Sequence, residues 1–159
     1  MRSTNLVEII TNNMRDENYS DIRGKLSLLN DLEQTDRDGR TLLINAAYYN
    51  RDDVVQWLVQ QGANINAQDH FGNSPLHAAV QNGNLIIIRI LLDSGADTNI
   101  QNNFGNTPIW IAKPAQPTEV FKLLLQFGAD PTLKNKFDVS AIDRMAAYPE
   151  IIKILKREI

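Results

Sequence analysis

Residues 69–79 read Asp69-His70-Phe71-Gly72-Asn73-Ser74-Pro75-Leu76-His77-Ala78-Ala79, and much of this stretch returns at intervals of 33 residues. One glycine recurs at that spacing, as do a hydroxyl residue two places later and a second glycine farther on. The three sets are Gly39, Gly72 and Gly105; Thr41, Ser74 and Thr107; and Gly62, Gly95 and Gly128. A fixed period of this length is typical of a repeat array in which each unit buries its apolar face against its neighbours.

The composition is that of one folded domain. The chain has 159 residues, of which 43% are hydrophobic and 22% charged, and its formal net charge is −3. Apolar residues are abundant and no long run of like charges occurs, which disfavours disorder and a basic face for nucleic acid. The chain has no cysteine, which excludes disulfides, thiolate metal sites and thiol nucleophiles.

The N-terminal residues favour a cytoplasmic location. Charged residues at Arg2 and Glu8 precede any apolar run of signal-peptide length, and no apolar run approaches the ~18 residues of a membrane span. We therefore expect no membrane association. The absence of cysteine would also suit export by a route that needs no cleaved signal.

Residues 1–35 are predicted to form two short helices that cap the array. The first carries apolar residues at 6, 7, 9 and 10, with Thr4 or Asn5 as its N-cap, and is expected to break in the polar stretch 11–18. The second places its apolar residues along one face: Tyr19, Ile22, Leu26 and Leu29. A terminal unit needs a polar outer side, because a bare repeat end exposes apolar surface.

Local signals define each full repeat. In residues 36–68, Gly39 stands where a tight turn needs positive φ, and Thr41 can cap the helix that follows. Gly62 is expected to end the second helix of the unit in a left-handed conformation.

The stretch Ser74-Pro75-Leu76-His77-Ala78-Ala79 resembles the ankyrin signature Thr-Pro-Leu-His-x-Ala, with serine in place of threonine. Ser74 suits an N-cap, Pro75 suits the first helical turn, and the small alanines let helices approach closely. The resemblance covers residues 36–134 directly. It implies an all-α solenoid of stacked helix-turn-helix repeats with projecting hairpin-like loops and helical caps. The chain is then a single domain, 1–159, with a cap at 1–35, repeats at 36–68, 69–101 and 102–134, and a second cap at 135–159.

The third repeat departs from this plan between its helices. Pro114 cannot continue a helix, so the first helix of residues 102–134 is predicted to end at or before Lys113 and to be shorter than its neighbours. Pro117 then suits the start of the next helix, and residues 115–116 are expected to form a differently shaped loop.

Residues 135–159 begin another unit and then shorten. Asp138 stands at the place of the turn glycines, and aspartate visits left-handed conformations more readily than most residues. Ser140 and Asp143 are predicted to form a capping box, and Pro149 to start the last helix.

The sequence holds no catalytic constellation. Only two histidines occur, and His77 takes the place of the histidine that ankyrin repeats use to tie neighbouring loops together. No phosphate-binding loop, metalloprotease, serine-hydrolase or dinucleotide motif is present. We therefore expect a non-enzymatic protein with no catalytic residues, cofactor or metal.

In ankyrin arrays, partners usually lie across a concave groove formed by loop tips and inner helices. The resemblance assigns the following residues to that groove: Arg37, Asp38, Arg40, Tyr48, Tyr49, His70, Phe71, Asn73, Gln81, Asn82, Asn103, Phe104, Asn106, Lys136 and Phe137. Phe71, Phe104 and Phe137 are 33 residues apart, so translation by one repeat, roughly 10 Å, sets them in a row. The row is either a binding stripe or a structural ladder in which each ring covers its own loop, and the sequence leaves both open.

We expect reversible binding of another protein by a monomer. Affinity would come from the aromatic row, and selectivity from Arg37, Asp38, Arg40, Asn73 and Asn106. The alternative is a dedicated inhibitor or stabilising accessory subunit of one enzyme. Nucleic-acid binding is a third possibility, against which the acidic balance of the chain argues.

Overall fold

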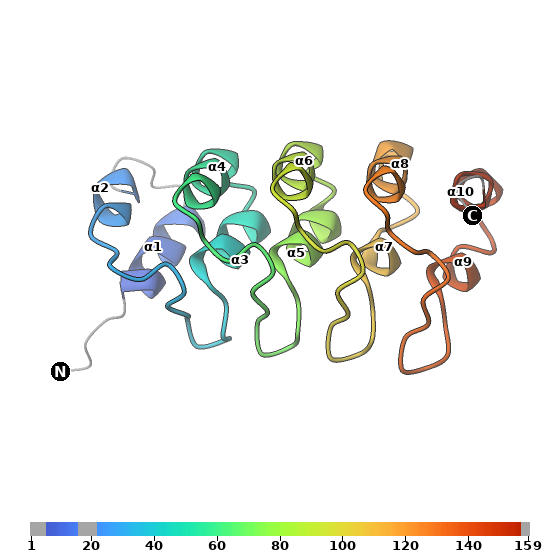
Figure 1. The fold of residues 1–159 in the computed structure, drawn as a ribbon, viewed down its shortest axis with the longest axis horizontal. Helices are drawn as coiled ribbons and strands as arrows, with labels where there is room; N and C mark the ends of the chain where they lie inside the picture. The colour runs from blue at the N-terminus through green and yellow to red at the C-terminus, as the bar shows by residue number, and fades with distance from the viewer. Residues whose placement is uncertain (1–5, 16–21, 157–159) are drawn as a thin grey trace.

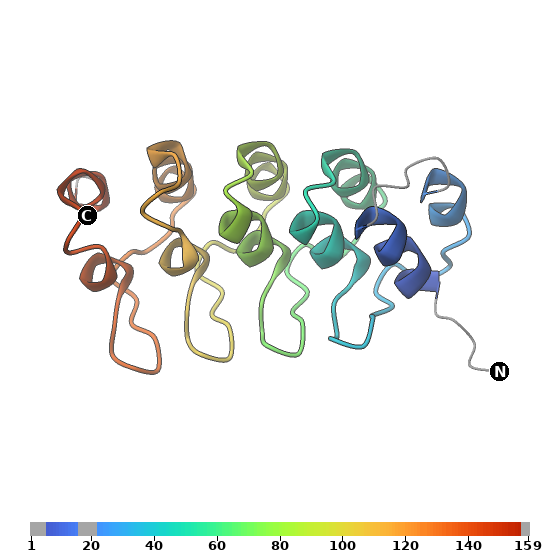
Figure 2. The ribbon, with the colours of Figure 1, turned by 180° about the vertical axis from the view of Figure 1, so that it is seen from behind.

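The computed structural model describes residues 6–15 and 22–156, and this part of the chain is a helical solenoid (Figure 1). Its regular elements are α1 (Leu6–Arg15), α2 (Ile22–Leu26), α3 (Leu42–Tyr48), α4 (Asp52–Gln60), α5 (Pro75–Asn82), α6 (Leu85–Asp93), α7 (Pro108–Ile111), α8 (Thr118–Gln126), α9 (Ala141–Arg144) and α10 (Pro149–Leu155). Odd-numbered helices form one row and even-numbered helices a second row above it, with loops projecting below (Figures 1 and 2). The all-α ankyrin-type solenoid predicted from the sequence is confirmed.

In the first two full repeats, the local signals in the sequence mark helix ends as predicted. Thr41 caps α3 by accepting a hydrogen bond from the Ile44 N–H, and Ser74 caps α5 by accepting one from the His77 N–H. Gly62 adopts a φ of 83° after α4, as the left-handed helix end requires.

The core lies between the two rows of helices and runs the length of the array. Leu43 and Ala47 of α3, Leu76 and Ala79 of α5, and Ile109 of α7 are all fully buried. The alanines keep adjacent inner helices close, because their side chains take up little space between the backbones. Each helix packs mainly on its own pair and on the neighbouring pair, which is the contact pattern of a one-dimensional array.

One side-chain turn organises each projecting loop. Asp69 accepts hydrogen bonds at Oδ1 from the backbone N–H groups of Phe71 (2.9 Å) and Asn73 (2.8 Å). The same pair of bonds, to the residues two and four places later, recurs every 33 residues, at Asp36, Asp69, Asn102 and Asn135. The sequence period therefore fixes a loop conformation as well as a helix pattern.

The N-terminal helices differ from the sequence-based prediction. The predicted break in residues 11–18 is wrong at its start, because α1 continues through Thr11 to Arg15. Thr11 and Met14 are buried on the face of α1 that packs against α3, so tertiary contact keeps this polar stretch helical. The second helix ends at Leu26, and Leu29 follows it in a turn. The predicted roles of Thr4, Asn5 and Tyr19 lie outside the described residues.

The repeat register also begins earlier than the sequence analysis recognised. Asp31 accepts a hydrogen bond from the Glu33 N–H, and the same turn recurs at Asn64, Asp97 and Asp130. Glu33 in turn accepts one from the Asn64 N–H (2.8 Å). Residues 31–35 thus join the N-terminal helices to the first full repeat as one repeat joins the next.

The shortened helix of the third repeat is confirmed. α7 ends at Ile111, before Pro114, and has four residues where α5 has eight. The carbonyl oxygens of Trp110 and Ala112 at its end accept hydrogen bonds from Nη1 of Arg144, at 2.8 and 2.6 Å. Arg144 therefore supplies donors where the interrupted helix cannot.

The C-terminal unit has the predicted local features. Asp138 adopts a φ of 61°. Ser140 and Asp143 form the capping box of α9, and hydrogen bonds from Ser140 hold the pKa of the Asp143 carboxyl below its usual range. α10 starts at Pro149.

Candidate protein-binding surface

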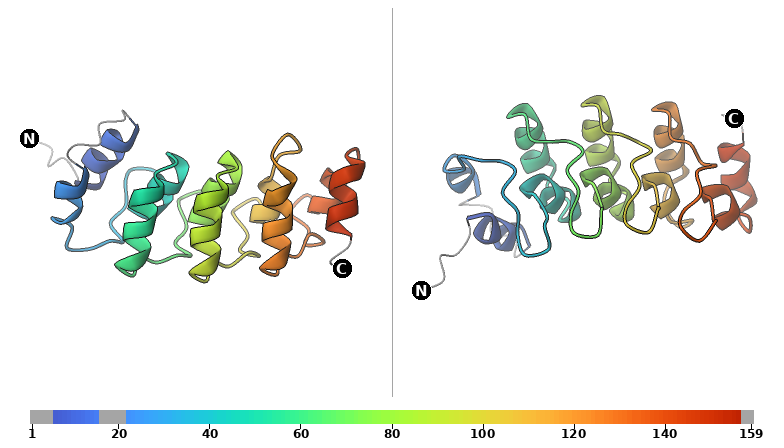
Figure 3. Two further views of the ribbon diagram at one scale, coloured as in Figure 1. Left: turned by 90° about the horizontal axis from the view of Figure 1, so that it is seen from above. Right: turned by 60° about the horizontal axis from the view of Figure 1, so that its bottom comes forward.

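The surface that the sequence analysis singled out lies on the loop tips and on the inner helices of the first two full repeats. In the structure it continues over the whole row of odd-numbered helices α1, α3, α5, α7 and α9, and we call this surface the inner face. The loops project side by side beneath these helices when the lower side of the molecule is turned forward (Figure 3, right). The inner face combines a row of exposed aromatic rings with a charged cleft at its N-terminal end.

Phe71, Phe104 and Phe137 are the exposed aromatic residues of the loop tips. Their exposed fractions are 49%, 50% and 72%, and none of them belongs to the hydrophobic core. In each case the backbone N–H donates a hydrogen bond to the side chain that organises the loop turn, which is Asp69, Asn102 or Asn135. About half or more of each residue's surface is nevertheless open to solvent. Exposed aromatic rings of this kind are enriched at protein interfaces.

Backbone hydrogen bonds join each loop to the next. The N–H of His70 donates to the Asp38 carbonyl (3.0 Å), and that of Asn103 donates to the Phe71 carbonyl (2.9 Å). The N–H of Lys136 donates to the Phe104 carbonyl at 3.0 Å. The loop tips are therefore coupled along the array by backbone hydrogen bonds.

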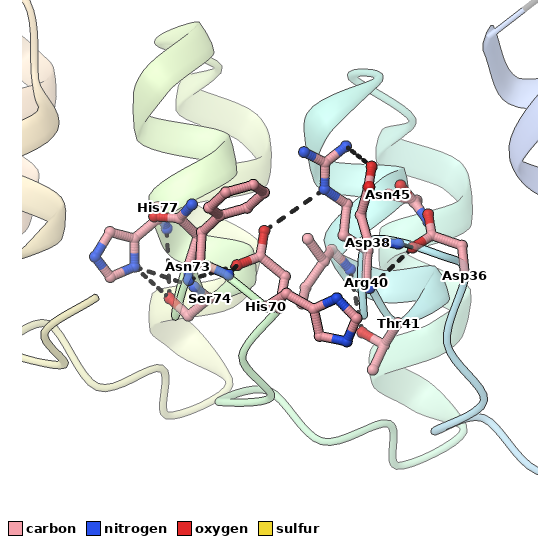
Figure 4. Close-up of polar contacts among 12 residues, drawn as sticks. Asp36, Asp38, Arg40, Thr41, Asn45, His70, Asn73, Ser74 and His77 are labelled. Carbon is pink, nitrogen blue, oxygen red and sulfur yellow. Dashed lines mark hydrogen bonds and ion pairs between the residues drawn. The ribbon is translucent and has the colours of Figure 1, made fainter. Parts of the chain in front are cut away.

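Side chains reinforce these loop contacts, and they include three residues to which the sequence analysis assigned selectivity. The Arg40 guanidinium reaches from the first repeat toward the second (Figure 4), with Nε 3.5 Å from the Asp69 carboxylate. The later junctions replace this ion pair by amide pairs, Asn73 with Asn102 at 2.9 Å and Asn106 with Asn135 at 2.8 Å. Arg40, Asn73 and Asn106 thus hold the loops together.

His77 ties the second repeat to the third. Its Nδ1 accepts from the Ser74 N–H (Figure 4). Nε2 therefore carries the proton and donates to the Asn106 carbonyl at 2.9 Å. Burial lowers the pKa of His77 below its ordinary value, and the hydrogen bond to Asn106 offsets this only in part. A buried neutral imidazole with both nitrogens bonded is a structural group, in line with the role that the sequence resemblance implies.

The inner helices contribute a second aromatic group. The rings of Tyr48 and Tyr49 meet edge to face with centroids 5.2 Å apart, and the Arg40 guanidinium lies 5.0 Å from the Tyr48 ring centre. Asn82 donates to the Tyr48 carbonyl at 2.7 Å, and Gln81 is exposed beside it. These residues lie on the helices above the loops, while Asn103 and Lys136 lie at exposed loop tips.

A cleft of about 300 Å³ opens between α1, α3 and the first loop, and we call it the N-terminal cleft. Four residues named from the sequence line it, namely Arg37, Asp38, Arg40 and Tyr49. The sequence analysis missed the rest of its wall, made by Glu8, Thr11, Asn12, Arg15, Asp36 and Asn45. Thr11, Asn12 and Arg15 were missed because the helix was predicted to break at residue 11, and Glu8 was missed because the stacking of α1 on the first repeat was not foreseen.

The described residues contain no cluster of three or more histidine or acidic side chains placed to hold a metal ion. Within the same residues, no helix has both the length and the apolar character needed to cross a membrane.

The chain is similar to several proteins that carry ankyrin repeats. It is 43% identical over 58 residues to rabankyrin-5 of Mus musculus, a match covering 36% of this chain and 5% of that protein. It is 43% identical over 61 residues to the ankyrin repeat domain-containing protein OPG015 of Monkeypox virus, covering 38% of this chain and 14% of that protein. It is 51% identical over 47 residues to neurogenic locus notch homolog protein 1 of Homo sapiens, covering 30% of this chain and 2% of that protein.

The chain thus spans only a small part of the length of these relatives. A family model described as ankyrin repeats (3 copies) matches residues 4–69 and 43–135, which together exceed half of the chain. Ankyrin repeats are in general non-catalytic modules of protein–protein interaction. The repeat register, the loop turns and this match agree, and the chain belongs to the ankyrin repeat family.

Proposed function

We propose that this chain binds a partner protein through its inner face, as a monomer and without catalysis. The observation that carries the proposal is the row formed by Phe71, Phe104 and Phe137 at the loop tips. Each ring is at least about half exposed on a loop whose backbone is held by the Asp or Asn turn and by the neighbouring loop. Desolvation of exposed aromatic rings is a major source of binding energy at protein interfaces.

The rigidity of the loops supports the same proposal. A surface that is ordered before binding loses little conformational entropy when the partner docks, so more of the contact energy appears as affinity. The hydrogen bonds between successive loops, with His77 buried behind them, provide this order. The cytoplasmic location expected from the N-terminal residues and from the lack of a long apolar run is part of the proposal and is testable by fractionating cells that express the tagged chain.

The test replaces Phe71, Phe104 and Phe137 together by serine and measures the proteins retained from native lysate. We expect retention to fall by at least about tenfold with helicity unchanged, because an interface anchor is commonly worth ~2 kcal/mol. The matched control is Ile86→Ser, which removes a 59% exposed apolar side chain from α6 in the other row of helices. Retention of the same proteins at unchanged affinity by the triple variant would contradict the proposal. A single stoichiometric partner whose activity changes would identify the chain as a dedicated inhibitor or accessory subunit.

A further inference from the structure

At the junction between the first two loops, a carboxylate already binds a guanidinium group of this chain: Asp69 pairs with Arg40. Asp69 is 7% exposed, and its two carboxylate oxygens have different roles. Oδ1 accepts the N–H groups of its own loop, and Oδ2 receives the Arg40 guanidinium from the preceding loop at 3.5 Å. A carboxylate at this position therefore organises one loop and binds a cation supplied from the N-terminal side.

Asp36 occupies the same position one repeat earlier. Its Oδ1 accepts the N–H groups of Asp38 (2.9 Å) and Arg40 (3.0 Å), as Oδ1 of Asp69 does in the next loop. Its Oδ2 accepts a hydrogen bond from Nδ2 of Asn45 at 2.8 Å. None of the ion pairs among the described residues includes Asp36, so this carboxylate has no cation equivalent to Arg40.

The space in front of Asp36 is the N-terminal cleft, and two buried polar atoms in its wall have no partner. Asn45 is fully buried, and its Oδ1 accepts no hydrogen bond. The hydroxyl of Thr11, which is 9% exposed, also lacks a partner. Ala78 stands at the place of Asn45 in the next repeat, so the unsatisfied amide is a feature of this unit rather than of the repeat pattern. A buried acceptor without a donor costs free energy until a ligand or water satisfies it.

The cleft wall holds three acidic residues, Glu8, Asp36 and Asp38, and three basic ones, Arg15, Arg37 and Arg40, so the pairing among them decides which charge lacks a partner. The Arg37 guanidinium is 2.9 Å from the Glu8 carboxylate, and Arg40 lies 3.5 Å from Asp69. Arg15 also has an interaction of its own. The arginines at the cleft are thus engaged, whereas the Asp36 carboxylate and the Asn45 carbonyl oxygen both lack a cationic donor.

We propose that the N-terminal cleft receives an arginine side chain of the partner protein, with Asp36 pairing to its guanidinium as Asp69 pairs to Arg40. The planar guanidinium offers five donors in a fixed fork, which matches the geometry of a carboxylate such as that of Asp36. The Tyr49 ring in the cleft wall offers an aromatic surface beside it. This inference rests on the proposed function in that the arginine belongs to a bound protein, but the site is testable without that protein.

The test titrates the full chain with N-acetyl-arginine methylamide and follows amide signals by two-dimensional NMR, with the lysine and glutamate analogues as comparisons at equal ionic strength. We expect the arginine probe to shift the Asn45 side-chain signals and the backbone signals of residues 36–40, with a dissociation constant on the order of millimolar for so small a ligand. The lysine probe should bind about fivefold or more weakly, and the glutamate probe should leave these signals in place.

Asp36→Asn separates the charge of Asp36 from its loop role. The fold should persist, because Asn102 and Asn135 make the same turn at the equivalent positions. We expect D36N to lose at least about fivefold in affinity for the arginine probe. The control is Asp97→Asn, which removes one acidic charge from another exposed loop where Asn64 makes the equivalent turn, and which should bind as the wild type does.

Three results would overturn the proposal: no shift of cleft signals with the arginine probe, equal binding of all three probes, or unchanged binding by D36N. If the arginine probe does not bind but the aromatic triple variant loses partner retention, the arginine site is wrong and the proposed function is supported. If the arginine probe binds as expected but the triple variant retains its partners, the proposed function is wrong and the arginine site is supported.

Discussion

Gly72 and Asn103 are packed so closely that a Cβ atom on Gly72 would lie 2.7 Å from the Asn103 backbone nitrogen. Gly72 also has a φ of 78°, so two constraints act on it, the conformation of its own turn and the approach of the following loop. Gly62 has a similar φ of 83° but nothing lies within 4 Å of where its Cβ would be. This pair of glycines separates the two constraints.

We predict that Gly72→Ala destabilises the protein much more than Gly62→Ala. The left-handed conformation costs alanine about 1–2 kcal/mol at either site, and overlap with the next loop adds about 1–3 kcal/mol at Gly72 only. Urea denaturation followed by circular dichroism measures both values. Equal losses at the two glycines would show that the loops can separate at no cost.

The C-terminal unit supports the same interpretation of the loop contact. Asp138 takes the place of the turn glycines at a φ of 61°, and its side chain is exposed and 2.9 Å from the Lys134 amine. No further loop packs on this turn in the described part of the chain, so a side chain fits there. A glycine is needed in the earlier loops because another loop follows them.

The burial of His77 predicts a pH-dependent stability. Its pKa is lowered in the folded protein, so the unfolded chain binds the proton more readily once the pH falls below about 6.5. The stabilisation is therefore complete above that pH and is lost as the pH falls toward the lower folded-state pKa. We expect the free energy of unfolding to drop between pH 7 and 5 by up to about 1.4 kcal/mol per pH unit from this one group.

His77→Gln should flatten that pH profile, because glutamine keeps hydrogen-bonding capacity and does not titrate. The measurement is the free energy of unfolding of both proteins at pH 7, 6 and 5. If the difference between them is constant over this range, His77 does not carry the dependence.

The sequence predicts the repeats well because the same positions of each unit are buried, so apolar and turn residues recur at the repeat period. It also predicts the short α7, since Pro114 blocks a helix without help from distant residues. The extension of α1 through Thr11 is missed because burial of Met14 against the first repeat overrides the weak helix preference of the polar stretch. The N-terminal cleft is missed with it, since Glu8 and Thr11 meet Asp36 only when the helices stack.

The pairing of Arg40, Asn73 and Asn106 with the following loop is another feature that a single repeat does not reveal. Each residue occupies a loop position typical of partner contact, yet each pairs with Asp69, Asn102 or Asn135 in the following loop. The paired residues are 29 apart, so a search for identical residues at a period of 33 does not connect them.

We predict that Arg144→Ala loosens the C-terminal end of the array and leaves its N-terminal part intact. Losing Arg144 leaves the Trp110 and Ala112 carbonyls without their donor and removes a guanidinium that lies 4.8 Å from the Trp110 ring centre. The cost should be about 1–3 kcal/mol. Hydrogen exchange should accelerate in α7 and α9 but not in α3, and uniform acceleration would contradict nearest-neighbour coupling.

The Arg40–Asp69 ion pair and the two asparagine pairs occupy equivalent positions at successive loop junctions. We predict that an asparagine pair can replace the ion pair, and a double-mutant cycle tests this. Arg40→Asn alone leaves the mostly buried Asp69 carboxylate without its cation. Asp69→Asn alone leaves Arg40 with only the exposed Asp38 carboxylate, 3.7 Å away, as its anion. We expect each single variant to lose about 1–2 kcal/mol. The double variant recreates the Asn73–Asn102 pair at the first junction, so it should recover about 1 kcal/mol or more relative to the sum of the single losses. Urea denaturation of the four proteins gives this coupling energy. Additive losses would mean that the two side chains stabilise their own loops independently and that the junction has no preferred pair.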